Sequence, residues 1–153
     1  MANVPGLRSP YSRVGRLIFF GRMLDKIRLH ADGKLPEAYA KNLGDAQIGF
    51  LDGRVCRFLG VAYPDMVKRT LASGTDDEIL AWAESDGRRK TDEECYIFNS
   101  FVAKRGWRDE RTAVMRQMAA DHGLDSKPID SILDFIDFDE GRDPAEHRGW
   151  ICA

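Results

Sequence analysis

The sequence predicts an all-α protein, a compact orthogonal bundle of five to seven helices around a central N-terminal helix. Three observations support this fold class. Apolar residues in the second half recur at intervals of three and four, as they do along one face of an amphipathic helix. Glycines follow most of these periodic segments, where they can end a helix in the left-handed conformation. No segment longer than four residues alternates between apolar and polar side chains like a half-buried strand.

We expect a single domain over residues 1–153, because a chain of this length can bury about two thirds of its unfolded surface in one core. Residues 1–12 are predicted to form an N-terminal arm. Residues 143–153 are predicted to form a loosely held tail, in which Trp150 and Ile151 are the side chains able to dock it.

The first long helix is predicted over Val14 to Ala31. Its segment from Leu17 to Leu24 is apolar on nearly all sides, which places the helix at the centre of the bundle. Arg22 lies inside this apolar run, and a buried arginine needs a partner. Two interpretations stay open: an ion pair with Asp25 or with the acidic last helix, or an anionic ligand.

The stretch from Gly33 to Gly60 is rich in glycine. It predicts a short helix near residues 36–42 and then irregular structure, of the kind that often carries function. Residues 52–61 are the one place where a small hairpin would fit the pattern.

Capping patterns delimit the later helices. Thr75 with Glu78 and Thr91 with Glu94 each form a capping box, in which each side chain satisfies the backbone N–H of the other residue. Five helices are predicted, over residues 64–73, 76–85, 92–104, 109–122 and 129–139. Left-handed C-terminal caps are predicted at Gly74, Gly87, Gly106, Gly123 and Gly141.

Composition excludes several classes of protein. The 23 basic and 25 acidic residues nearly cancel, so no global field recruits nucleic acid or anionic lipid. No stretch approaches the roughly 18 apolar residues of a membrane span. The three cysteines are far apart and odd in number, which favours a reducing cytoplasm over a disulfide framework. Residues 1–60 carry ten basic and five acidic residues, so the charge is divided along the chain.

Common catalytic and metal-binding signatures are absent from the sequence. It contains no HExxH, CxxC, EF-hand, Walker or GxSxG pattern, so we predict neither a metal nor a cofactor. Residues 76–104 resemble a helix-turn-helix only superficially, because three carboxylates open the second helix and would repel DNA. Cys56 lies between Arg54 and Arg57, which could activate an exposed thiol, although an isolated cysteine is more often a small buried hydrophobic residue.

The most promising arrangement is an anion pocket at the start of the central helix, where unpaired backbone N–H groups favour a phosphate or carboxylate. Arginine forks would add bidentate hydrogen bonds. The predicted ligand-binding residues are Arg8, Tyr11, Arg13, Arg54 and Arg57, supported by Arg22 and Asp25. The alternative is that Ser9 or Ser12 caps the helix while the arginines are solvated or pair with the acidic half.

Several segments of the chain also resemble a bacterial family that is named as a domain of unknown function, DUF5069. The resemblance extends over roughly residues 7–142 and rests on 7–12, 21–30, 33–36, 42–44, 52–60, 104–109 and 138–142. It implies a bacterial origin and a soluble single-domain protein. It implies no reaction and no catalytic residue, because the family carries no assigned activity.

Two functions therefore remain open, and the sequence does not decide whether the protein is an enzyme. The first is the binding of a small anionic ligand, such as a nucleotide, sugar phosphate or carboxylate, or an enzyme acting on one. The second is a protein-interaction or homodimerisation module anchored by exposed aromatic residues such as Trp82, Trp107 or Trp150. A deep cleft lined by arginines would favour the first, and a flat apolar patch the second.

Overall fold

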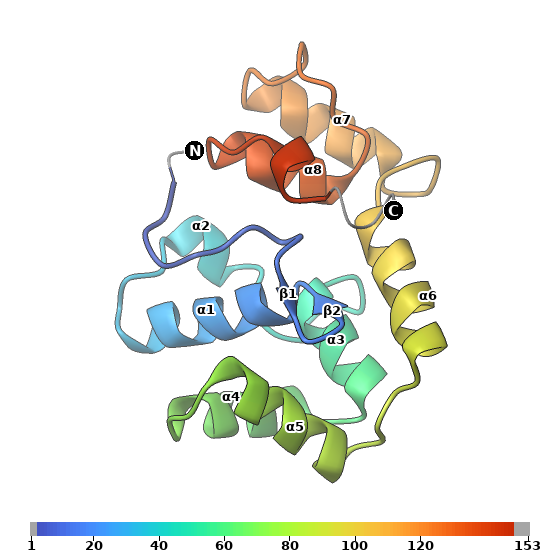
Figure 1. The fold of residues 1–153 in the computed structure, drawn as a ribbon. Helices are drawn as coiled ribbons and strands as arrows, with labels where there is room; N and C mark the ends of the chain where they lie inside the picture. The colour runs from blue at the N-terminus through green and yellow to red at the C-terminus, as the bar shows by residue number, and fades with distance from the viewer. Residues whose placement is uncertain (1–2, 149–153) are drawn as a thin grey trace.

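The structure is a computed structural model that describes residues 3–148, and it confirms the predicted helical bundle (Figure 1). Eight α-helices, one more than expected, and one two-stranded ribbon lie within these residues. The helices are α1 (Phe20–Ala31), α2 (Glu37–Ala40), α3 (Leu51–Leu59), α4 (Tyr63–Leu71), α5 (Asp76–Asp86), α6 (Asp92–Ala103), α7 (Thr112–Asp121) and α8 (Ile132–Asp139), followed by the 3-10 turn η1 (Pro144–Glu146). No helix in the described part of the chain has the length and apolar character that a membrane span requires.

The central helix is shorter than the sequence predicts, because it begins at Phe20 and not at Val14. The residues before it form an antiparallel ribbon of β1 (Arg13–Val14) and β2 (Leu17–Ile18), which turns at Gly15 with a positive φ of 55°. The Asn99 side chain of α6 accepts the N–H of Ile18 and donates to the carbonyl of Arg16. These contacts with a distant helix override the local helical pattern.

The glycine-rich stretch contains helix α3 where the sequence allowed a hairpin, so that alternative is wrong. α3 ends at Gly60, which adopts the left-handed conformation at φ 75°. Gly53 lets the preceding loop pack closely on this helix, because a Cβ there would lie 2.7 Å from the Cβ of Asp45. The loop is fixed further by a hydrogen bond from the N–H of Gly53 to the carbonyl of Gly44.

Both predicted capping boxes are present at the starts of α5 and α6. Four of the five predicted glycine caps have positive φ, but Gly87 has φ −89°. Glycine is needed there for a close approach, since a Cβ would lie 2.0 Å from the carbonyl oxygen of Leu59. The last helix begins at Ile132, three residues later than predicted, because the Ser131 side chain accepts the N–H of Asp134.

Buried apolar side chains form two clusters. The larger one joins the ribbon with α1 and α3 to α6, and the smaller one joins α7 to α8. In Figure 1 the α7–α8 pair lies at one end of the molecule, and α6 runs along one side towards it. The N-terminal arm passes between α1 and α8, where Leu7, Ser9 and Tyr11 are buried. Pro144 is buried in the predicted tail, whereas Trp150 and Ile151 lie outside the described residues.

Candidate functional site

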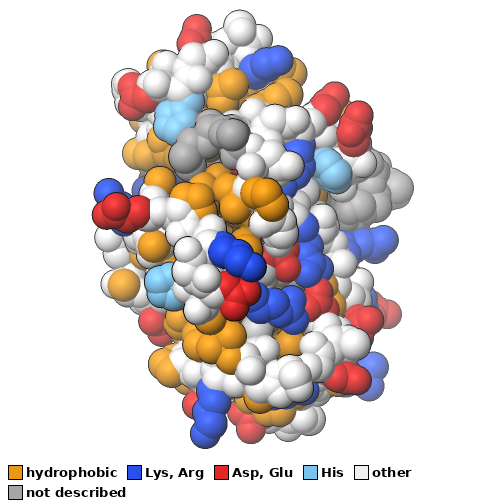
Figure 2. Space-filling view, turned by 90° about the vertical axis from the view of Figure 1, so that its left-hand side faces the viewer, with side chains coloured by type: hydrophobic (Ala, Val, Ile, Leu, Met, Phe, Trp, Pro, Cys, Tyr) orange, Lys and Arg blue, Asp and Glu red, His pale blue; other side chains and the backbone are white. Residues whose placement is uncertain are grey.

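A cavity of about 390 Å³ lies between α1 and α2 on one side and α7 and α8 on the other. Its size falls in the range of small-molecule sites. Four basic side chains, Arg22, Lys26, Arg105 and Arg111, and two acidic side chains, Asp139 and Glu140, contribute to its wall. Apolar side chains, among them Phe50, Met118 and Phe135, supply much of the rest. On the face in Figure 2, basic and acidic side chains are interleaved across the middle, and hydrophobic side chains are exposed between them.

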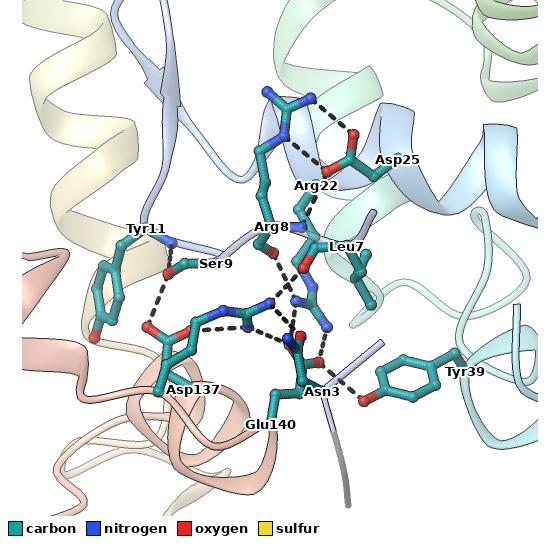
Figure 3. A network of polar contacts seen from close by, with 11 residues as sticks. Asn3, Leu7, Arg8, Ser9, Tyr11, Arg22, Asp25, Tyr39, Asp137 and Glu140 are labelled. Atoms are coloured by element: carbon teal, nitrogen blue, oxygen red, sulfur yellow. Dashed lines mark hydrogen bonds and ion pairs between the residues drawn. The ribbon is translucent and has the colours of Figure 1, made fainter. Parts of the chain in front are cut away.

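Arg22 and Glu140 form a buried ion pair in this wall, with side chains only 3% and 1% exposed. Nη1 and Nη2 of Arg22 donate to the two carboxylate oxygens at 2.9 and 2.5 Å, and Nη1 also donates to the carbonyl of Arg8 (Figure 3). Tyr39 donates its hydroxyl to Glu140 at 3.0 Å. Burial favours the neutral acid, but the bonds from Arg22, Arg142 and Tyr39 prevail and hold the pKa of Glu140 below its ordinary value. Of the two interpretations of Arg22, the structure therefore shows the pair with the end of the last helix.

Lys26 lies one helical turn beyond Arg22 and forms a second buried pair. Its Nζ lies 2.5 Å from Oδ1 of Asp52, whose Oδ2 accepts the N–H of Gly44. Burial lowers the pKa of the Lys26 ammonium, although the charge of Asp52 opposes that shift. The ammonium lies 5.2 Å from the ring centre of Phe19, a residue with φ 67°. A left-handed bulky residue is strained, and such strain is often found at functional sites.

His122 and Asp139 form a third polar element of the cavity. Nδ1 of His122 lies 2.7 Å from Oδ1 of Asp139, and the ring meets the Phe135 ring edge-on. A carboxylate oxygen accepts hydrogen bonds, so in this contact the Nδ1–H of His122 donates to Asp139. The His122 side chain is 36% exposed, which makes it accessible to a ligand. The pair therefore adds an accessible polar group to the cavity wall.

Sequence reasoning missed Lys26 and the His122–Asp139 pair as site residues. Lys26 carried a usable signal, because residues 22 and 26 share one face of a helix. His122 and Asp139 carried no such signal in the sequence. They lie at the C-terminal ends of two different helices, α7 and α8, which only the folded structure brings together.

The other predicted site residues near the central helix have protein partners. Arg8 donates from Nε and Nη2 to the carboxylate of Asp25, both at 2.7 Å (Figure 3). Its Nη2 also lies 2.7 Å from Oδ2 of Asp76. These bonds raise the pKa of the Arg8 guanidinium. The buried Tyr11 hydroxyl donates to Asp134 at 2.7 Å, and burial raises its pKa. Arg8, Tyr11 and Asp25 thus fasten the N-terminal arm.

Arg54 and Arg57 lie elsewhere, in an open groove between α3 and α6 that also includes Phe58 and Phe101. Arg13 lies exposed on β1. The structure therefore brings Arg54 and Arg57 together with each other, but it places them in a different hollow from those lined by Arg8 and Tyr11.

Cys56 between these arginines is a buried core residue. Burial raises the pKa of its thiol to about 12, and its Sγ lies 3.8 Å from the Met23 sulfur. A thiol in this environment is not activated as a nucleophile. Within residues 3–148, no group of three or more His, Cys, Asp or Glu side chains is arranged to hold a metal ion.

Comparison with known proteins identifies the family. The family model described as "Domain of unknown function (DUF5069)" matches residues 4–142, a range that contains every residue of the cavity wall named above. A search of the curated proteins gives no match. Because the match covers most of the sequence, the chain belongs to the DUF5069 family.

Proposed function

We propose that this protein binds a small ligand with an anionic group in the cavity between α1 and α8. The observation that carries the proposal is a basic side chain in the cavity wall that is unpaired within the described residues, since the other three basic groups there already pair with carboxylates. Arg111 is the most available of the four. Its side chain forms no hydrogen bond or ion pair within residues 3–148, and it is exposed at the cavity.

The other basic groups have different parts in this proposal. Arg22 and Lys26 already pair with carboxylates, so they set the local field and shape the wall. Arg111 would hold a phosphate or carboxylate through a bidentate fork. Phe50, Met118 and Phe135 would pack against the less polar part of the ligand. A nucleotide, a sugar phosphate or a carboxylate would each fit this description.

The direct test is thermal unfolding of the purified protein with phosphorylated metabolites, nucleotides and carboxylates. A ligand at about a hundred times its Kd stabilises a protein by roughly 2.7 kcal/mol, which raises Tm by several degrees. Arg111→Gln should abolish the shift, and Ala38→Trp should do the same by filling the exposed side of the cavity. Arg116→Gln removes an equal charge from the same helix and is the matched control. A panel without stabilising ligands, or shifts that survive both cavity variants, would refute the proposal.

The interaction module is the second candidate, and exposed apolar residues favour it. Tyr96 and Ile97 on α6 are 66% and 59% exposed, and Phe101 and Trp107, later in the chain, are 43% and 50% exposed. Light scattering over a range of protein concentrations tests the homodimer. A monomer at every concentration would contradict it.

We also propose the bacterial cytoplasm as the compartment. Cys56 and Cys95 are both free and buried, which suits a reducing environment.

A further inference from the structure

The groove between α3 and α6 is a second hollow, distinct from the cavity. It has a volume of about 560 Å³ and is open to solvent. Its walls are mainly aromatic and aliphatic: Phe58 and Phe98 stack with ring centres 4.2 Å apart, and Ile97 and Phe101 are exposed beside them. One carboxylate, that of Glu94, also lines the groove, and it pairs with Arg88. Arg54 and Arg57 form its basic end.

These two arginines have no carboxylate within ion-pair distance in the described residues. Both donate to the same backbone carbonyl, that of Ile48, at 3.4 Å from Arg54 and 2.8 Å from Arg57. Nε of Arg54 is buried and has no hydrogen-bond partner within residues 3–148. A buried N–H without an acceptor loses the hydrogen bond it would make to water, so this arrangement is unfavourable as it stands.

A third arginine adds to the unbalanced charge. The guanidinium carbons of Arg54 and Arg105 lie 4.9 and 5.5 Å from the ring centre of Phe101. Burial lowers the pKa of Arg54, the charges of Arg105 and Arg57 lower it further, and the charge of Glu110 opposes this shift only in part. Arg105 has carboxylate partners in Asp109 and Glu110, whereas within residues 3–148 the Ile48 carbonyl is the one hydrogen-bond acceptor of the Arg54 and Arg57 side chains.

We infer that this groove binds an amphipathic anion, with a phosphate or carboxylate held by Arg54 and Arg57 and an apolar body resting on Ile97 and Phe101. The anion would supply the acceptors that the two guanidinium groups lack, with charge-assisted bonds. Burying a ring or an alkyl group would cover apolar surface that is now exposed. Arg54, Arg57, Ile97 and Phe101 line the groove and not the cavity, so the groove can bind an anion even if the cavity binds nothing.

The test is a titration of the ¹⁵N-labelled protein with phenyl phosphate, followed by amide NMR. We expect saturable shifts in residues 54–58 of α3 and 97–101 of α6. Inorganic phosphate, titrated in parallel, should bind more weakly because it has no apolar body. The double variant Arg54→Gln/Arg57→Gln should lose about tenfold or more in affinity, since hydrogen bonds to charged groups are lost. Phe101→Leu tests the apolar wall with the charges kept.

Two controls separate this site from the cavity. Arg116→Gln should leave the groove affinity unchanged, and so should the cavity variant Arg111→Gln. The inference is overturned if α3 and α6 show no saturable shifts, or if the double variant binds phenyl phosphate as tightly as the wild type. Equal affinity for inorganic phosphate would overturn the apolar part of it.

Discussion

Arginines of this chain occupy two contrasting regions. Between α1 and α8, Arg8, Arg22 and Arg142 all pair with carboxylates, and the last two also bond to backbone carbonyls of the N-terminal arm. In the α3–α6 groove, Arg54 and Arg57 share one carbonyl and repel each other. The same residue type therefore holds the fold together in one region, and in the other it forms no ion pair within residues 3–148.

The difference shows why an arginine count is a poor guide to a ligand site. A buried arginine that is matched by a carboxylate has little left to offer a ligand, and removing one partner leaves an uncompensated charge. An arginine without a counter-ion contributes little to stability and can gain from an anion. Substitutions between α1 and α8 should therefore reduce mainly the stability of the fold, and substitutions in the α3–α6 groove should reduce mainly the binding of an anion.

The largest effect is expected for Arg22→Met. It leaves the buried Glu140 with a reduced set of partners, and breaking a buried pair costs about 3–5 kcal/mol. Urea denaturation should show this loss in the free energy of unfolding. The double variant Arg22→Met/Glu140→Gln should recover part of it, because no buried charge is then left without its partner. A loss below about 1 kcal/mol in the single variant would show that Arg22 is not structural.

A smaller loss, roughly 1–2 kcal/mol, is expected for Arg8→Met. Arg8 holds Asp25 and Asp76, but its side chain is 31% exposed, so water can replace part of what it provides. The same denaturation experiment measures it. A loss as large as that of Arg22→Met would contradict the dependence on burial.

The pH dependence of stability should follow from the carboxylates in this region. The pKa values of Glu140 and Asp76 are lowered in the folded state, so the stabilisation is present above their ordinary values, near pH 4, and is lost as the pH falls below them. Burial raises the pKa of Asp137, so this carboxyl alone would make the folded state more stable as the pH falls. Stability measured from pH 6 to pH 3 should decline, and Glu140→Gln should decline less steeply. If the stability of the wild type and that of Glu140→Gln decline equally with pH, Glu140 does not contribute to the pH dependence.

The smallest effect is expected in the groove. Arg54→Gln/Arg57→Gln removes two like charges that form no ion pair within residues 3–148, so the free energy of unfolding should change by no more than about 0.5 kcal/mol, or rise. Thermal and urea unfolding both report it. A loss of several kcal/mol would place these residues with the structural arginines.

The parts of the fold that local chemistry determines were predictable from the sequence. Thr75 and Thr91 cap their helices through contacts three residues away, and both capping boxes are present. The start of the central helix was not predictable, because Asn99, about eighty residues later, holds the preceding residues in a ribbon. The partner of Arg22 was predicted as one of two alternatives, since the acidic end of the last helix is visible in the sequence but its position in space is not.

The candidate site was less predictable than the fold. Arg22 was identified from its place in an apolar run, and it does line the cavity. Arg111, Lys26 and His122 were not identified, because their significance depends on which partners surround them. Only the folded structure shows that Lys26 pairs with the carboxylate of Asp52 and that Arg111 lines the cavity.

NMR of the arginine Nε–Hε groups during a phosphate titration tests most directly which arginines stabilise the fold and which bind an anion. This experiment observes each guanidinium separately and reports which ones meet the anion. We expect the signals of Arg54, Arg57 and Arg111 to move and those of Arg8 and Arg22 to stay fixed. Movement of Arg8 and Arg22, with Arg54 and Arg57 unaffected, would contradict the division of the arginines between structure and binding.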